Sequence, residues 1–176
     1  MNRKLHITEL DRLRPEEFKK AEKHPIVILL DNIRSHHNVG SIFRTADAFR
    51  VERVLICGIT PAPPHKDIRK TALGADETVD WESGDAEELI RIYRQQGYKV
   101  FAVEQTEKST PLQDFNVEQD GVLLILGNEV EGVDQRLIDL CDGSIEIPQQ
   151  GTKHSLNVSV CCGIVLWHAF HQLNER

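Results

Sequence analysis

The chain has 176 residues, of which 40% are hydrophobic and 28% charged. This is the composition of one globular domain, so it excludes a disordered protein and argues against two domains. The formal net charge of −7 argues against a uniformly basic, general polyanion binder. Residues 31–70 carry 7 basic and 4 acidic side chains, whereas residues 71–148 carry 5 basic and 18 acidic ones. This asymmetry is compatible with a basic working face on an acidic body and, equally, with evenly solvated charges.

Neither end of the chain predicts export or a membrane anchor. No apolar run precedes Ile26, and polar residues interrupt the apolar stretch over 155–173. The four cysteines lack both Cys-x-x-Cys spacing and a secretory context, so we expect reduced thiols. These observations predict a soluble, cytoplasmic protein with no membrane partner.

The first 24 residues are expected to form an N-terminal helical extension. Leu10, Leu13 and Phe18 give residues 8–23 the pattern of a short amphipathic helix. A continuous apolar run at 26–30 then predicts a buried strand, where the main domain begins and continues to residue 176.

A polar loop follows this strand and leads into a helix over 40–49. We expect Asn38 to cap that helix, which places Arg44 about two turns inside it. The next strand, 53–57, precedes a proline-rich connection over 58–77. Parallel sheets bind ligands beyond the carboxyl ends of their strands, so this long connection is expected to be functional, with simple surface tolerance as the alternative.

The remaining elements continue the alternation of strands and helices. The expected helices are 85–96, 134–141 and 155–173, and the expected strands are 99–103, 122–126 and, more weakly, 144–147. Ser155 is a natural N-cap for the last helix, and Asn157 would then lie in its first turn. Apolar strands separated by helices indicate an α/β fold, with a mostly parallel sheet covered by helices on both faces.

Three segments after strands are more polar than simple connections require: 32–47, 126–132 and 147–159. Each alone is explained by turn and cap chemistry, but three at one sheet edge favour a binding site. The phosphate-loop, dinucleotide-binding and Gly-x-Ser-x-Gly signatures are missing, and no His/Cys cluster has metal-ligand spacing. No metal is therefore expected.

The three segments resemble the motifs of the SpoU-type, or TrmH-like, RNA ribose 2′-O-methyltransferases of the SPOUT class. The first motif matches residues 38–47, the second matches 126–129 with Gly132, and the third matches 147–160 with Gly151. Their order and spacing fit as well, and the resemblance covers residues 25 to 172. Val130 stands where the family commonly has glycine, and Gln149 where methionine is frequent.

The resemblance implies a SPOUT-like α/β knot, in which the C-terminal part of the chain forms a trefoil knot that holds S-adenosylmethionine. Connection rules alone would not predict a knot. By motif position, the implied cofactor-binding residues are Glu104, Gly127, Asn128, Ile147 and Leu156. The implied catalytic residues are Arg44, Asn38, Glu129, Ser155 and Asn157.

Arg44 is the catalytic position of the family, which is often described as a general base. Because arginine stays protonated in proteins, we expect Arg44 to stabilise the developing alkoxide and to bind an adjacent RNA phosphate. Family members are homodimers, in which the arginine of one subunit reaches the cofactor of the other. The apolar residues spread around the 155–173 helix suit such an interface, although a fully buried core helix would show the same pattern.

The expected partner is RNA, with tRNA favoured over ribosomal RNA. Only about two dozen residues precede the first strand, so recognition is expected from the dimer surface, residues 8–23 and the 58–77 connection. The alternatives are a ribosomal RNA 2′-O-methyltransferase and a non-catalytic RNA-binding module of the same fold. A methyltransferase acting on a base or a small molecule remains open, and a dinucleotide oxidoreductase is more distant.

Overall fold

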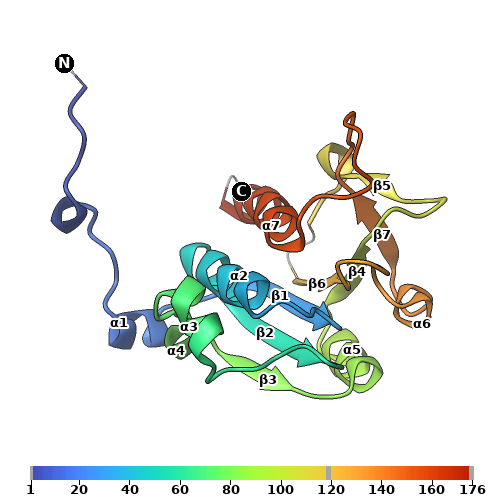
Figure 1. The fold of residues 1–176 in the computed structure, drawn as a ribbon, viewed down its shortest axis with the longest axis horizontal. Helices are drawn as coiled ribbons and strands as arrows, with labels where there is room; N and C mark the ends of the chain where they lie inside the picture. The colour runs from blue at the N-terminus through green and yellow to red at the C-terminus, as the bar shows by residue number, and fades with distance from the viewer. Residues whose placement is uncertain (1, 118–119, 175–176) are drawn as a thin grey trace.

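A single parallel sheet organises the chain in the computed structural model, which describes residues 2–117 and 120–174 (Figure 1). Met1 and residues 175–176, the outer ends of the two expected domain ranges, lie outside the described residues. The described strands are β1 (His24–Asp31), β2 (Val51–Cys57), β3 (Trp81–Ser83), β4 (Lys99–Val103), β5 (Thr110–Pro111), β6 (Val122–Leu126) and β7 (Gly143–Glu146). They lie in the order β3-β2-β1-β6-β4-β7-β5, and every pairing between neighbours is parallel.

Helices cover both faces of this sheet (Figure 1). The α-helices are α1 (Pro15–Lys20), α2 (His36–Ala48), α3 (Lys66–Ala72), α4 (Ala75–Thr78), α5 (Ala86–Gln95), α6 (Gln135–Ile138) and α7 (Val158–Asn174). Two 3₁₀ turns, η1 (Ile7–Glu9) and η2 (Leu112–Asp114), complete the described elements. The prediction of an α/β fold with a parallel sheet and helices on both faces is confirmed. No helix in the described ranges is long and apolar enough to cross a membrane.

The central strand β1 shows why its sequence is apolar throughout. Ile28 points into the cluster formed with α2 and α7, whereas Leu29 points into the cluster formed with α5 and α6. Successive side chains of a strand point to opposite faces, so a strand covered on both sides needs apolar residues at every position. β1 is also paired on both edges, by β2 and β6.

The expected amphipathic helix over 8–23 is wrong in extent. Residues 7–9 form only a 3₁₀ turn, Asp11 has a positive φ of 47°, and α1 begins at Pro15. Proline is common at the first position of a helix, because its ring fixes φ near the helical value and it has no N–H that needs a hydrogen-bond partner. Of the three apolar residues in the pattern, only Phe18 is buried, and the segment before α1 extends away from the body (Figure 1).

Two expected helix caps are also wrong. Ser35, not Asn38, caps α2, because its Oγ accepts a hydrogen bond from the N–H of Asn38 at 3.3 Å. The last helix begins at Val158, and Asn157 rather than Ser155 holds its first turn, with its Oδ1 accepting from the N–H of Ser159 at 2.9 Å. In both places more than one residue near the helix start had a side chain suited to capping.

The 58–77 connection is largely folded, which its proline content concealed. It contains α3 and α4, and α3 is capped by His65, whose Nδ1 accepts from the N–H of Asp67 at 3.2 Å. The short strands β3 and β5 were not predicted, and α6 is a single turn inside the expected 134–141 helix. Elements of two to four residues are too short to show a periodic pattern.

Candidate functional site

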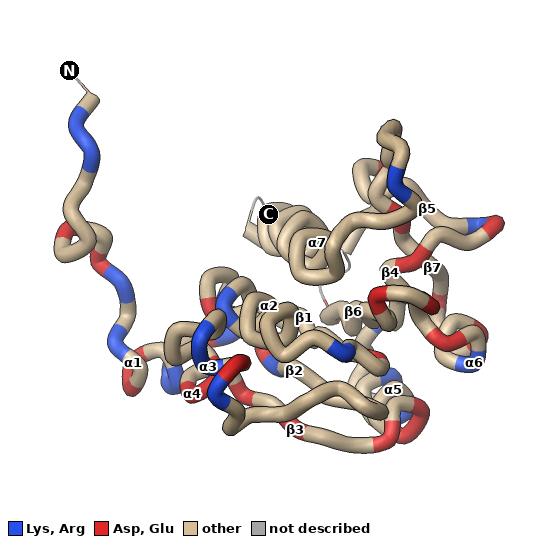
Figure 2. Tube along the Cα trace, in the orientation of Figure 1, with Lys and Arg blue, Asp and Glu red and all other residues tan. Residues whose placement is uncertain are grey.

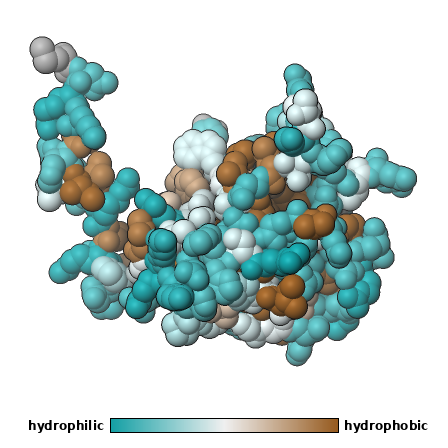
Figure 3. Space-filling model, viewed as in Figure 1, coloured by the Kyte–Doolittle hydropathy of each residue, from teal (hydrophilic) through white to brown (hydrophobic). Residues whose placement is uncertain are grey.

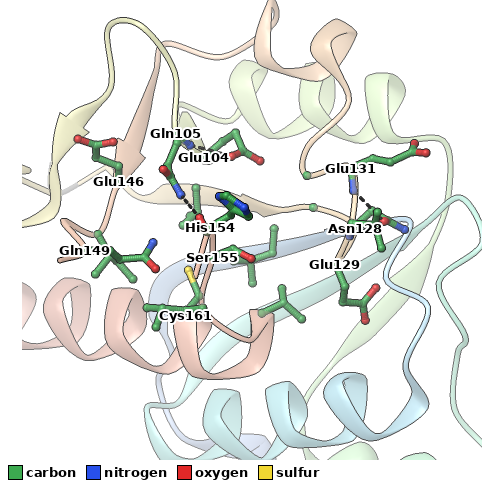
Figure 4. A pocket seen from close by; sticks show the side chains of 18 of the residues that line it. Glu104, Gln105, Asn128, Glu129, Glu131, Glu146, Gln149, His154, Ser155 and Cys161 are labelled. Atoms are coloured by element: carbon green, nitrogen blue, oxygen red, sulfur yellow. Dashed lines mark hydrogen bonds between the residues drawn. The ribbon is translucent and has the colours of Figure 1, made fainter. Parts of the chain in front are cut away.

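A pocket of about 290 Å³ opens at the carboxyl edge of the sheet, beyond β6, β4 and β7 (Figure 4). This is the edge at which parallel sheets bind ligands. The loops after these three strands and the start of α7 line it. The lining residues are Val103, Glu104, Gln105, Leu126, Gly127, Asn128, Glu129, Val130, Glu131, Gly132, Ile145, Glu146, Ile147, Gln149, His154, Ser155, Leu156, Val158 and Cys161.

The loop after β6 is a closed turn that admits no side chain at its base. Asn128 and Gly132 exchange both backbone hydrogen bonds, at 2.9 and 3.0 Å. A Cβ on Gly127 would lie 2.2 Å from the backbone of Gly132 and Val133, so this position requires glycine. The side chain of Asn128 is used within the structure: its Oδ1 accepts from two N–H groups of the turn, and its Nδ2 donates to the carbonyl of Asn32.

The Glu129 carboxylate joins this turn to the loop after β1. It accepts hydrogen bonds from the N–H of Arg34 at 3.0 Å, the N–H of Ser35 at 3.2 Å and Nδ2 of Asn38 at 3.0 Å. Partial burial alone would raise the pKa of Glu129, but these hydrogen bonds outweigh it and hold that pKa below its ordinary value. Glu129 is therefore ionised at neutral pH and acts as a fixed anchor.

Asn38 and Asn157 extend this anchor to the third motif. Asn38 donates to Glu129 through its Nδ2 and accepts through its Oδ1 from Nδ2 of Asn157 at 3.2 Å. The Oδ1 of Asn157 in turn accepts from the Ser159 N–H and hydroxyl. One continuous set of hydrogen bonds therefore connects the start of α2, the β6 loop and the start of α7.

Glu104 and Gln105, directly after β4, close the other side of the pocket (Figure 4). Glu104 accepts from the N–H of Val133 at 3.0 Å, and Gln105 donates its side-chain amide to the carbonyl of His154 at 2.9 Å. The sequence did not single out Gln105 or His154. The rule that ligands bind beyond the carboxyl ends of parallel strands would have pointed to Gln105, which follows a buried strand.

The structure brings together most of the residues expected in the site. All five expected cofactor-binding residues line the pocket, namely Glu104, Gly127, Asn128, Ile147 and Leu156. Of the expected catalytic residues, Glu129 and Ser155 also line it, and the network of hydrogen bonds adds Asn38 and Asn157. Arg44 is different: it is exposed on α2 and does not line the pocket of its own chain.

The pocket combines an apolar floor with acidic walls. Leu126, Ile145 and Val158 supply apolar surface, and four glutamates stand around it without a lysine or arginine among the lining residues. The thiol of Cys161 is also at its edge, and burial raises the pKa of this thiol to about 11. Cys161 is therefore a neutral thiol at physiological pH and not a nucleophile.

All four cysteines are free thiols. Over the ranges 2–117 and 120–174, no group of three or more His, Cys, Asp or Glu side chains has the geometry to hold a metal ion.

A parallel α/β sheet with a pocket of this kind at its carboxyl edge is typical of the ligand-binding α/β folds. The comparison with protein families identifies which one: the model of the SpoU rRNA methylase family matches residues 25–167. The chain belongs to this family, and the relatives below are RNA methyltransferases.

The names of two relatives show the range of substrates among similar proteins. The tRNA (guanosine(18)-2′-O)-methyltransferase of Thermus thermophilus is 30% identical over 166 residues, which cover 94% of this chain and 84% of that protein. The 23S rRNA (guanosine-2′-O-)-methyltransferase of Coxiella burnetii is 31% identical, over 88% of this chain and 62% of that protein. This chain therefore spans less than two thirds of the Coxiella enzyme.

Solved structures agree with the fold. An AdoMet-bound rRNA methyltransferase from Sinorhizobium meliloti superposes with a TM-score of 0.81 at 26% identity, covering 89% of this chain and 60% of that one. The TrmH/SpoU tRNA-modifying enzyme of A. aeolicus gives the same TM-score at 25% identity, covering 92% of this chain and 83% of that one.

Proposed function

We propose that this chain is an S-adenosylmethionine-dependent RNA methyltransferase that methylates a ribose 2′-hydroxyl. The observation that carries the proposal is the continuous hydrogen-bonded path from Glu129 through Asn38 to Asn157 beside the pocket. It connects one residue from each of the three motifs that resemble the family. Structural caps alone do not require three distant segments to share one set of hydrogen bonds.

The pocket fits S-adenosylmethionine in charge and in polarity. The cofactor carries a sulfonium and an ammonium group against one carboxylate, so its net charge is positive, and the pocket presents glutamates and no basic side chain other than His154. The apolar surface of Ile147, Leu156 and neighbouring residues suits the adenine ring. The AdoMet-bound Sinorhizobium relative supports the same assignment.

When bound, the cofactor supplies a methyl group whose leaving group is a neutral thioether. The remaining demand is on the nucleophile, because a ribose hydroxyl is a very weak acid. During the transfer the hydroxyl proton would pass to an RNA phosphate or to water. Arg44 stabilises the negative charge that develops on the ribose oxygen and binds the adjacent phosphate through its planar guanidinium group.

Arg44 acts on the pocket of a second copy of the chain in this proposal. Its exposure on α2, outside the lining of its own pocket, supports that arrangement. α7 supplies a suitable contact surface, because Val160, Ile164 and Trp167 form one exposed apolar stripe at positions i, i+4 and i+7. Figure 3 shows hydrophobic surface over α7.

The trefoil knot belongs to the same proposal. β7 lies between β4 and β5 in the sheet, and the chain then returns across the pocket to α7, which packs against α2 and β1 (Figure 1). A knot formed in this return would hold the loops over 126–132 and 147–157 in fixed positions around the cofactor. Residues 25–176 would form this methyltransferase domain and residues 1–24 an extension of it.

Transfer RNA is the favoured substrate, and ribosomal RNA is the second candidate. The match covers 84% of the Thermus tRNA enzyme and 62% of the Coxiella rRNA enzyme, which supports testing tRNA first. Such an enzyme would act in the cytoplasm, where its substrate and cofactor meet.

The role of Arg44 tests the proposal. Removing one preorganised charge donor from a transition state costs about 10²–10³-fold in kcat, so Arg44→Ala should lose at least that much methyl transfer. Arg44→Lys should recover only part of it, because lysine cannot bind phosphate and oxygen through two parallel hydrogen bonds. The affinity for S-adenosylmethionine should change little in either variant, and a wild-type rate in Arg44→Ala would contradict the proposal.

A further inference from the structure

The exposed side of α3 is the strongest feature that the pocket leaves unexplained. Lys66 and Lys70 are four residues apart on this helix and both are exposed, whereas Ile68 and Ala72 on the other side are buried. Residues at i and i+4 lie on one face of a helix, so the two ammonium groups form a single outward stripe. In the described part of the chain neither lysine has an ion pair with a carboxylate, whereas their neighbour Arg69 contacts Glu77.

This stripe is held rigidly against the helix that carries Arg44. A Cβ on Gly40 of α2 would lie 2.1 Å from Oγ1 of Thr71 and 2.3 Å from the carbonyl oxygen of Ile68, so the two helices pack at the closest possible distance. The Thr71 hydroxyl also donates to the carbonyl of His37 at 3.1 Å. α3 is therefore a fixed part of the site surroundings and not a flexible loop.

The rings of His36 and His65 connect the two helix starts. Their centroids are 4.0 Å apart, and His65 is the residue that caps α3. This contact brings the start of α3 next to the start of α2, where Asn38 joins the hydrogen-bonded network. The helix that carries the lysine stripe therefore begins beside the start of α2, from which Asn38 reaches the hydrogen-bonded network.

Arg44 lies on the same side of α2 as this junction. His37, Ser41 and Arg44 follow the spacing i, i+4 and i+7, so they form one stripe along α2. Its neighbours show where that stripe lies: Gly40 faces α3, and Thr45 is the side chain nearest to Gly163 of α7. The Arg44 stripe is therefore the surface of α2 between α3 and α7.

Charge is distributed unevenly over the molecule. The protein carries a net charge of −7, and 18 of its acidic residues lie in residues 71–148. Figure 2 shows blue segments along the N-terminal extension and along α3, with red ones beside α3 in α4, and red segments around α6 and the loops near β4 and β7. A polyanion is repelled by the acidic part and attracted to the basic part, which restricts how it can approach.

We propose that the α3 stripe, Lys66 and Lys70, binds the phosphate backbone of the RNA substrate next to the nucleotide that is methylated. The inference rests on the proposed function, because it assigns a contact surface for the RNA of that same site. Backbone phosphates carry no sequence information, so the stripe fixes the position and direction of the RNA and not its sequence. Arg44 of the same chain and the pocket of the second copy then act on the ribose that this docking presents.

The test compares two charge-matched double variants. Lys66→Gln with Lys70→Gln removes the stripe. Arg91→Gln with Lys99→Gln removes two exposed charges, one from α5, which covers the other face of the sheet, and one from the amino end of β4. Binding of total tRNA is measured by fluorescence anisotropy over a range of salt concentrations. Thermal unfolding and S-adenosylmethionine affinity of each variant establish that the fold and the pocket are intact.

Loss of the stripe should weaken tRNA binding by about tenfold or more at low salt. It should also make the slope of log K against log salt concentration shallower, by the amount expected for the loss of about two phosphate contacts. It should raise KM for RNA with little change in kcat, and Lys66→Arg with Lys70→Arg should restore binding. The Arg91/Lys99 control should resemble wild type. If wild type binds tRNA, and the Lys66/Lys70 variant has the same tRNA affinity and the same salt dependence as the Arg91/Lys99 control, the α3 assignment is overturned and the proposed function is not affected. A wild-type protein that neither binds RNA nor transfers methyl would overturn the proposed function as well.

Discussion

Glu129 holds two backbone N–H groups and one side-chain amide with a single carboxylate. Because hydrogen bonds to a charged acceptor are stronger than neutral ones, this one side chain sets the distance between the β6 loop and the start of α2. The neighbouring Glu131 lies on the same turn and also lines the pocket, but its side chain is exposed and makes no comparable contact among the described residues. The two glutamates therefore form a matched pair for mutation.

We predict that Glu129→Gln lowers methyl transfer by about tenfold or more, because a neutral amide cannot accept all three hydrogen bonds, whereas Glu131→Gln stays within about threefold of wild type.

The lowered pKa of Glu129 means that its contribution to stability is complete above the ordinary value of 4.5 and is lost as pH falls through the lower folded-state pKa. The difference in unfolding free energy between wild type and Glu129→Gln should therefore narrow as pH falls from neutrality through 4.5 and then through the lower folded-state pKa. A difference that is independent of pH in denaturant titrations would contradict this account.

At this scale the sequence predicted which residues gather but not how each is used. Polar residues after strands were sufficient to place Glu129 and Asn157 in one site, because the carboxyl ends of parallel strands share an edge. The prediction named the wrong capping residue for both helices. Ser35 caps α2 in place of Asn38, and Asn157 caps α7 in place of Ser155, because serine and asparagine are both suited to a capping position. Only the backbone geometry decides between them.

The start of α7 depends on Asn157 in two separable ways: its Oδ1 caps the helix, and its Nδ2 donates to Asn38. We predict that Asn157→Ala lowers the unfolding free energy by about 1 kcal/mol through loss of the cap, as well as impairing activity. Asn157→Asp keeps the cap oxygen and should retain most of the stability while losing activity, because it removes the donor and adds a charge near Glu129.

Ser155→Ala is the control for this pair, since its exposed side chain makes no hydrogen bond among the described residues. Its unfolding free energy should stay within about 0.5 kcal/mol of wild type in chemical denaturation. If Ser155→Ala lowers the unfolding free energy as much as Asn157→Ala does, Ser155 contributes to the cap of α7.

The packing of α3 on α2 requires glycine at position 40. Gly40→Ala should destabilise the protein by about 1–3 kcal/mol, because its Cβ meets the backbone of α3 at 2.3 Å. Gly163→Ala in α7 places its Cβ 3.9 Å from the nearest described atom, so helix propensity should make it neutral or stabilising by up to about 1 kcal/mol. Thermal unfolding measures the stability of both variants. Equal changes in stability would show that the close approach of α2 and α3 does not exclude a side chain at position 40.

Longer elements were predictable because each carries an apolar stretch of several residues, as β1, β6 and α7 do. The 58–77 connection was read as a loop because Pro61, Pro63 and Pro64 exclude regular structure at its start. The roughly two turns of α3 that follow are too short for a clear pattern, and their stability comes from tertiary contacts with α2.

For the molecule as a whole, the proposed shared site requires two copies of the chain. Trp167 is 55% exposed at the end of the α7 stripe, a costly position for a large aromatic side chain in a monomer. Trp167→Glu should convert a dimer to monomer in sedimentation experiments and reduce methyl transfer, while each monomer still binds S-adenosylmethionine. Dimers that persist in this variant would place the interface elsewhere.

The central claim is the chemistry itself, and one measurement tests it most directly. Purified protein is incubated with labelled S-adenosylmethionine and, separately, with total tRNA and ribosomal RNA lacking the modification, and the digested nucleosides are analysed by mass spectrometry. The account predicts a 2′-O-methylnucleoside in the tRNA pool, absent with Arg44→Ala. Label on a base, or equal label with Arg44→Ala, would contradict it.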